Sequence, residues 1–260
     1  RDLKFLGGNR PLLRTALGIS FFWLLASLSQ MTIDPFVLDQ LHLDQKDVGI
    51  YLGVLVVGLG LGSVLSGLWS KGAVELGIVP IGAAIITVGA SSLAIVGSVV
   101  EQYATISMAG KYSAFTALFV LGVGAGLFNV PLEAFMQHRS ERETRGRILA
   151  AKNFISFSMM LVSAFLFWLL KGQLDMAAGS IFMVVAFATI PVILYAAWLL
   201  PQATIRAVVW LLTHTVYRVK VRGIENLPKR GGALLVANHV SWLDGILLLL
   251  VSSRNIRMIA

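Results

Sequence analysis

Residues 76–99 read LGIVPIGAAIITVGASSLAIVGSV, and this stretch decides the fold class because it carries no charged side chain. An α-helix of about 20 apolar residues is long enough to cross the hydrocarbon core of a bilayer. Five further apolar runs of this kind occur, at roughly 11–32, 48–70, 113–136, 148–170 and 177–200. The sequence therefore predicts a mainly α, polytopic membrane protein with six transmembrane helices.

The composition agrees with lipid as the solvent for most of the chain. Of its 260 residues, 57% are hydrophobic and 13% are charged, whereas a soluble domain has about 25% charged residues. Cysteine is absent, which excludes disulfides, a thiol nucleophile and thiolate metal ligands, and we expect no metal site. The net charge of +8 fits cytoplasmic loops and anionic lipid better than a nucleic-acid partner in such a protein.

The charges of the connecting segments alternate along the chain. The segment after the first run is acidic, with Asp34, Asp39, Asp44 and Asp47. The segment between the fourth and fifth runs is basic, with Arg139, Arg142, Arg145 and Arg147. The positive-inside rule therefore places the arginine-rich segment and both ends of the chain in the cytoplasm.

Three units follow from the order of these patterns. Residues 1–200 hold the six helices, and residues 201–216 form a shorter apolar segment with tryptophan and flanking arginines. This segment suits an amphipathic helix at the membrane surface, although a plain linker helix is the alternative. Residues 217–260 begin an α/β unit with a strand, a turn, a buried strand and a helix. We expect the chain to be part of a longer protein, because it opens in a basic segment and stops within an apolar pattern.

Few polar residues lie at depth in the predicted membrane helices. Gln30 closes the first helix, and Asn129, Glu133 and Gln137 follow one another at intervals of four, so these three share one helix face. Polar groups in a bilayer usually face a cavity or a partner helix. Two interpretations stay open, a polar lining of a substrate path and a helix end where Glu133 pairs with a loop arginine.

The glycine-rich stretches GLGLGSVLSG and GVGAG do not indicate a dinucleotide site. They lie inside apolar runs, whereas the dinucleotide motif follows a strand and opens a helix. Gly58 and Gly62 form a small-xxx-small pair, which favours close packing between membrane helices.

The pair His239 and Asp244, in the stretch NHVSWLDG, is the strongest candidate for catalysis. His239 directly follows a predicted strand, where α/β folds hold ligands, and Asp244 comes one turn later. A carboxylate on one ring nitrogen fixes the tautomer and leaves the other nitrogen free as a general base. The alternative is a surface histidine near an aspartate that caps a helix.

The stretch YRVKVRGIENLPKRGGALLVANHVSWLDG, residues 217–245, resembles the opening of the glycerophospholipid acyltransferase family. The resemblance implies that His239 is the general base for a free hydroxyl of a lysophospholipid or glycerol phosphate, and that Asp244 orients it. The family's later motifs would lie beyond Ala260, so the site is incomplete in this chain. No cofactor is implied beyond an acyl donor, which is a thioester of acyl carrier protein or of coenzyme A.

The stretches VELGIVPIGA and GLFNVPLEAFMQHRS resemble the second half of a major-facilitator transporter of the lysophospholipid type. The acidic and basic loop signature of that superfamily is reduced here to Lys71 and Glu75. This resemblance implies a bacterial inner-membrane protein that flips lysophospholipid and reacylates it, with membrane lipids and acyl carrier protein as partners. The alternatives are a transporter of another solute with a non-catalytic tail, and an acyltransferase that the helices only anchor.

Overall fold

The computed structural model describes residues 2–70, 75–103 and 107–216, together with residues 222, 223, 226, 228, 231–234, 236, 238 and 248. The elements in chain order are α1 (Asp2–Gly7), α2 (Arg10–Pro35), η1 (Phe36–Gln40), α3 (Gln45–Ser70), α4 (Ile78–Tyr103), α5 (Met108–Arg139), α6 (Arg145–Phe167), η2 (Trp168–Gln173), α7 (Ala178–Leu199) and α8 (Pro201–Val216). Six of the helices, from α2 to α7, are long and apolar enough to cross a membrane. The predicted number of spans is therefore confirmed.

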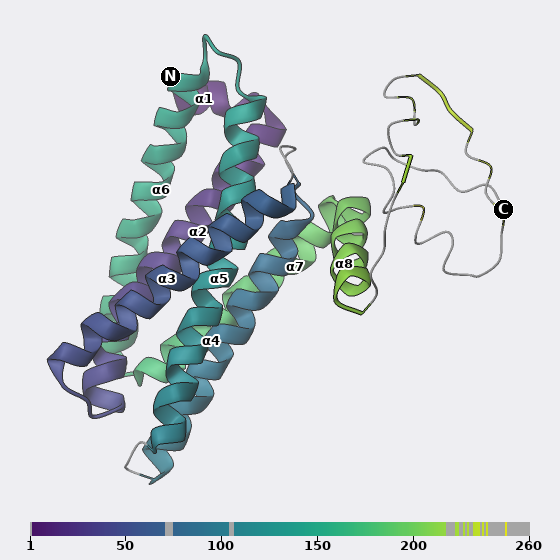
Figure 1. Cartoon of the computed structure of the whole chain (residues 1–260). Coiled ribbons are helices and arrows are strands. Elements are labelled where there is room, and N and C mark those ends of the chain that lie inside the picture. The colour runs from purple at the N-terminus through teal and green to yellow at the C-terminus, as the bar shows by residue number, and fades with distance from the viewer. Residues whose placement is uncertain are drawn as a thin grey trace.

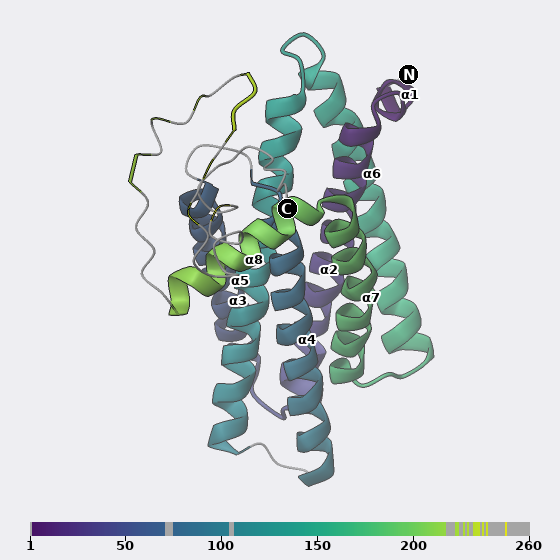
Figure 2. The same ribbon diagram turned by 90° about the vertical axis from the view of Figure 1, so that its right-hand side faces the viewer.

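The six long helices run side by side in one elongated bundle (Figure 1). α5 packs against α3 and α4, α7 packs mainly against α4, and α2 packs mainly against α6. The short helix α8 lies across the direction of the bundle (Figure 2). No strand occurs within the described parts of the chain, and the predicted α/β unit lies largely outside them.

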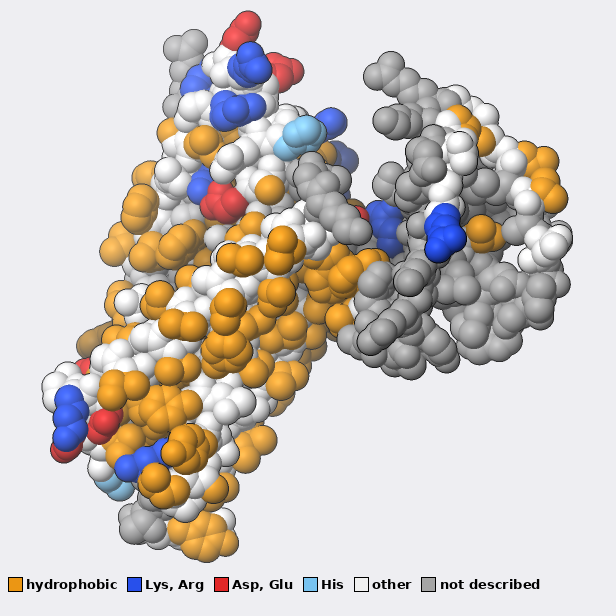
Figure 3. Space-filling view, in the orientation of Figure 1, with side chains coloured by type: hydrophobic (Ala, Val, Ile, Leu, Met, Phe, Trp, Pro, Cys, Tyr) orange, Lys and Arg blue, Asp and Glu red, His pale blue; other side chains and the backbone are white. Residues whose placement is uncertain are grey.

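The surface of the bundle has the distribution expected of a membrane protein. Hydrophobic side chains cover its flank, and charged side chains gather at its two ends (Figure 3). We call the end that carries Arg139, Arg142 and Arg145 the basic end, and the end that carries Asp39, Asp44 and Glu101 the acidic end. α2 starts at the basic end and α7 finishes there, which agrees with an even number of spans.

The first span is longer than the sequence predicts. We expected a loop from Asp34 onwards, but α2 continues to Pro35 and the π-helical turn η1 extends it to Gln40. Phe36 and Val37 are fully buried against the neighbouring helices. Burying these apolar side chains lowers the free energy of the helical conformation, whereas a solvated loop would leave them in water. The expectation of a loop starting at Asp34 was wrong for this reason.

Glycines set the closest helix contacts, as Gly58 and Gly62 predicted. A Cβ atom at either position would collide with the backbone of α5, at Phe119 and Val123 respectively. Gly126 of α5 is equally close to the backbone of α3, since its Cβ would lie 2.6 Å from the carbonyl oxygen of Leu59. α3 and α5 therefore touch along their backbones, as small residues allow in membranes.

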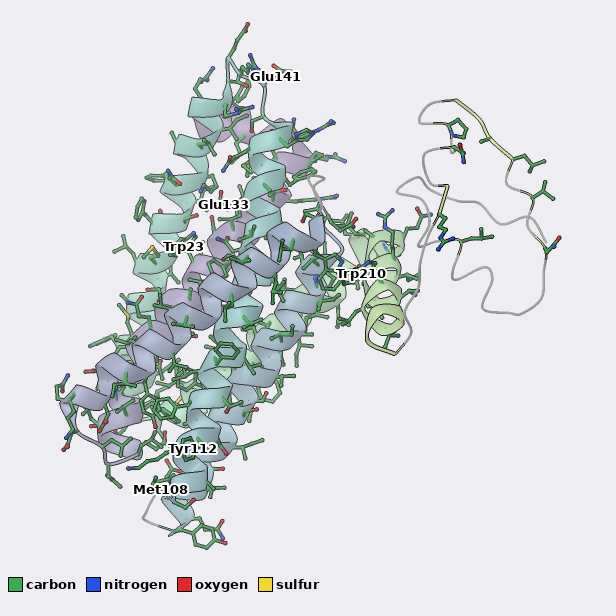
Figure 4. All side chains as sticks on the ribbon, in the orientation of Figure 1. Trp23, Met108, Tyr112, Glu133, Glu141 and Trp210 are labelled. Atoms are coloured by element: carbon green, nitrogen blue, oxygen red, sulfur yellow. The ribbon has the colours of Figure 1, made fainter. Side chains whose placement is uncertain are left out.

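α8 is fixed to the bundle by one face. Trp210 lies against Trp69 of α3, with ring centroids 4.4 Å apart, and Arg206 Nη2 contacts Glu75 Oε1 at 3.5 Å. A Cβ on Gly77 would collide with the carbonyl oxygen of Ala203, so the glycine admits the helix. Figure 4 shows Trp210 on the side of α8 that faces the bundle.

The opposite face of α8 is apolar and exposed. It presents Ile205, Val208 and Leu212, which are 50%, 39% and 56% exposed. An exposed apolar stripe on a helix that lies across a membrane bundle suits contact with the lipid surface. The role of 201–216 as an interfacial helix stays a prediction.

Candidate functional site

Gln30 and Asn129 are brought together at one cavity. They lie on α2 and α5, and both line a cavity of about 240 Å³ near the middle of the bundle. Its remaining wall is almost entirely apolar and includes Trp23 and Phe128, while Ser29 and Thr189 add hydroxyl groups. A mostly apolar cavity with a few convergent polar groups is the usual form of a small-molecule site.

The amide of Asn129 is the polar group best placed to bind a ligand in this cavity. Its Oδ1 atom is buried and has no hydrogen-bond partner among the described residues. An unpaired buried acceptor costs about 1–3 kcal/mol, so a ligand donor that reached this oxygen would recover that free energy. An ammonium or hydroxyl group of a substrate has the required donor.

Glu133 lies one turn beyond Asn129 but has a different environment. Its Oε1 accepts a hydrogen bond from Lys152 Nζ of α6 at 2.9 Å, and the two side chains are 25% and 10% exposed. The partner is thus a lysine of the next helix rather than a loop arginine. Glu133 does not line the cavity of Gln30 and Asn129, and Figure 4 shows it nearer the basic end than Trp23.

Gln137 lies a further turn along α5 and is exposed. The structure therefore places Gln30 and Asn129 on the wall of one cavity, pairs Glu133 with Lys152, and leaves Gln137 near the basic end of the bundle. The roles of Gln30, Asn129, Glu133 and Gln137 in a substrate path stay predictions.

A polar junction at the acidic end was missed by sequence reasoning. The side chain of Gln40 is buried, its Nε2 donates to Glu101 Oε1 at 2.9 Å, and its Oε1 accepts from the Gly179 amide at 2.7 Å. One amide therefore links η1, α4 and α7. A Cβ on Gly97 would lie 2.6 Å from the amide nitrogen of Gln40, so this glycine leaves room for the amide, but the sequence alone carries no signal that the two residues meet.

The predicted catalytic pair, His239 and Asp244, lies outside the described residues. Their roles as general base and orienting carboxylate stay predictions. What the structure describes is the connection to them, since α8 ends at Val216, shortly before the stretch that contains them.

Comparison with known proteins gives one finding for this stretch. Residues 218–260 match the model of the family described as Acyltransferase. No curated protein and no solved structure matches the chain significantly. The match supports acyl transfer as an activity of the protein and specifies neither donor nor acceptor. It covers the positions of His239 and Asp244.

Proposed function

We propose that this protein moves lysophospholipid across the bacterial inner membrane and reacylates it at an acyltransferase domain that begins near residue 217. The observation that carries the proposal is the order of the parts. A stretch matching the Acyltransferase family, 218–260, directly follows a helix that is docked on a bundle of six membrane-spanning helices. An acyltransferase in this position meets an acceptor that is itself a membrane lipid.

The proposed reaction assigns a role to each member of the histidine and aspartate pair. His239 removes the proton from the free hydroxyl of the lysophospholipid, and the oxygen attacks the carbonyl carbon of an acyl thioester. The carbon–sulfur bond breaks, and the imidazolium returns the proton to the thiolate. Asp244 orients the imidazole and stabilises its positive charge, as the aspartate does in a serine-hydrolase triad. The acyl donor is a thioester of acyl carrier protein or of coenzyme A.

The cavity of Gln30 and Asn129 supports the transport part of the proposal. It lies near the middle of the bundle and combines apolar walls with the buried amide oxygen of Asn129, which has no hydrogen-bond partner among the described residues. A lysophospholipid offers the matching groups, an acyl chain and a headgroup ammonium or glycerol hydroxyl. Transporters commonly hold their substrates near the bilayer midplane.

The arrangement of charges supports a cytoplasmic reaction. The basic end carries Arg139, Arg142 and Arg145, and positive residues favour the cytoplasmic side. α8 contacts Trp69 at the end of α3 and Glu75 just before α4, and these contacts support an acyltransferase that starts on that side. Fusion of the two activities would keep the flipped lipid close to the second site.

The test uses the full-length protein in proteoliposomes with labelled lysophosphatidylethanolamine and an acyl thioester. We expect His239→Ala to abolish reacylation, a loss of at least a thousandfold, while lysophospholipid still moves between leaflets. His214→Ala, at another histidine of this region, is the matched control and retains both activities. Reacylation by His239→Ala would refute the assigned base, and absence of lipid movement in the unaltered protein would favour helices that only anchor the enzyme.

A further inference from the structure

A second, larger cavity lies between the cavity of Gln30 and Asn129 and the basic end. Its volume is about 650 Å³, within the range of about 300–1,000 Å³ that ligand sites occupy. α2, α5 and α7 form most of its wall, and the start of α4 and Met159 of α6 complete it. None of the residues predicted for the substrate path lines it.

The wall of this cavity combines one charged side chain with a mainly apolar interior. Arg14 is the one charged residue among the described residues that line it, and apolar side chains such as Leu132, Val192 and Leu199 form the interior. Arg14 makes no ion pair and no hydrogen bond with any described side chain. A guanidinium that has no partner among the described side chains and lies at the rim of an apolar cavity favours an anionic group that can accept two parallel hydrogen bonds, as phosphate does.

The dimensions fit one leaflet of a bilayer. Phe21 and Phe128 line this cavity and also the cavity of Gln30 and Asn129, so they mark its inner limit. From Arg14 to Phe21 the helix rises about 10 Å at 1.5 Å per residue, compared with about 15 Å for half of the hydrocarbon core. The part of an acyl chain nearest to Arg14 could therefore fill the cavity down to these two rings.

The cavity is accessible from the surface of the bundle. Leu17 of α2 and Tyr195 of α7 line it and are 49% and 45% exposed. α2 packs mainly on α6 and α7 mainly on α4, and the contact between α2 and α7 is smaller. Exposed apolar side chains at the rim suit the entry of an acyl chain from the surrounding lipid.

We propose that this cavity is a phospholipid-binding site, in which the lipid phosphate pairs with Arg14 and one acyl chain lies between α2, α5 and α7. The arginine belongs to the second turn of α2 and therefore lies near the basic end of the bundle. The site is separate from the predicted substrate path and from His239. Phospholipid binding here and the proposed reacylation can therefore each fail without the other.

The test is photocrosslinking in nanodiscs that contain the full-length protein. The probe is a phosphatidylglycerol with a diazirine near the end of one acyl chain, and labelled peptides are mapped by mass spectrometry. We expect labelling at Phe21, Phe128 or Leu132. Arg14→Gln should reduce that labelling at least fivefold, whereas Arg10→Gln, at an exposed arginine that does not line the cavity, should leave it unchanged.

A filling variant separates the acyl-chain pocket from the charge. A Cβ on Gly18 would lie 3.4 Å from Leu132 Cδ1, which is an ordinary contact, so Gly18→Leu places its side chain in the cavity without a backbone collision. We expect it to remove the labelling, whereas Gly146→Leu, at an open position of α6, should not. Unlabelled phosphatidylglycerol should compete with the probe, and inorganic phosphate should not.

Three results would overturn the proposal. These are equal labelling of Arg14→Gln and Arg10→Gln, labelling confined to exposed residues such as Leu161 of α6, and competition by inorganic phosphate as strong as by lipid. The last result would indicate an anion site without an acyl-chain pocket. If Gly18→Leu does not fold, the comparison of the two arginine variants still decides the matter. Retention of reacylation in Arg14→Gln would show that the two sites act separately.

Discussion

Lys152 Nζ on α6 donates a hydrogen bond to Glu133 Oε1 on α5 at 2.9 Å. The lysine side chain is 10% exposed and the carboxylate 25%, so each charge has little solvent and depends on the other. Removing one partner of such a pair leaves an uncompensated charge, which is more costly than the pair itself is stabilising.

The first prediction concerns this pair. Lys152→Met leaves Glu133 unpaired and should lower the free energy of unfolding by roughly 3 kcal/mol, measured by thermal unfolding in detergent. The double variant Glu133→Gln with Lys152→Met should be more stable than Lys152→Met alone. Lys171→Met is the control, because its partner Asp39 is 60% exposed at 3.4 Å and exposed pairs contribute only about 0–1 kcal/mol. Equal losses at Lys152 and Lys171 would contradict the prediction.

The second prediction concerns the buried amide at the acidic end. Gln40→Leu keeps a similar volume but leaves the Gly179 amide without its acceptor, which was 2.7 Å away. An unpaired buried donor costs about 1–3 kcal/mol, and the same unfolding measurement should show that loss. Gln102→Leu, at an exposed glutamine near the end of α4, should be nearly neutral. A neutral Gln40→Leu would show that the junction contributes nothing.

The third prediction separates stability from transport at Asn129. Asn129→Leu removes a buried oxygen that has no partner among the described residues, so the unfolding temperature should stay equal or rise. Movement of labelled lysophospholipid in proteoliposomes should fall at least tenfold, because the cavity loses its free acceptor. Gln102→Leu, at an exposed glutamine near the end of α4, serves as the comparison and should transport normally. Unchanged transport by Asn129→Leu would remove this cavity from the substrate path.

The fourth prediction tests how α8 is docked. A Cβ on Gly77 would collide with the carbonyl oxygen of Ala203, so Gly77→Ala should displace α8 from the bundle. Since the chain has no cysteine, Ala207→Cys, at a position that is 2% exposed, should react slowly with maleimide, and adding Gly77→Ala should speed its labelling. Leu212→Cys, at a position that is 56% exposed, is the control and should be labelled equally with and without Gly77→Ala. Equal labelling of Ala207→Cys with and without Gly77→Ala would contradict docking of α8 by this face.

The membrane helices could be predicted because uninterrupted apolar runs leave few alternatives in a chain of this composition. Residues 177–200 were expected and α7 covers Ala178–Leu199. The end of the first helix could not be predicted, because Asp34, Pro35 and Asp39 are typical of a loop. Only the burial of Phe36 and Val37, which depends on neighbouring helices, shows why the helix continues.

Partners across helices were the least predictable part of the candidate site. The spacing of Asn129 and Glu133 placed both on one face of a helix, but not what that face meets. Lys152 is 19 residues from Glu133 in sequence, and any of the nearby arginines would have satisfied the same charge rule. Gln40 gave no periodic signal at all, because a single glutamine at a helix end is compatible with solvent as well as with burial.

The amide of Gln40 also restricts how this molecule can change shape. It contacts Glu101 at the end of α4 and Gly179 at the start of α7, and the second of these hydrogen bonds is buried. Sliding of either helix past η1 would break one of these bonds, so they favour joint movement of α2, α4 and α7 at the acidic end. A conformational change that opens this end without breaking these bonds would have to bend or separate the bundle elsewhere. The Gln40 amide thereby limits the positions at which the bundle can hinge.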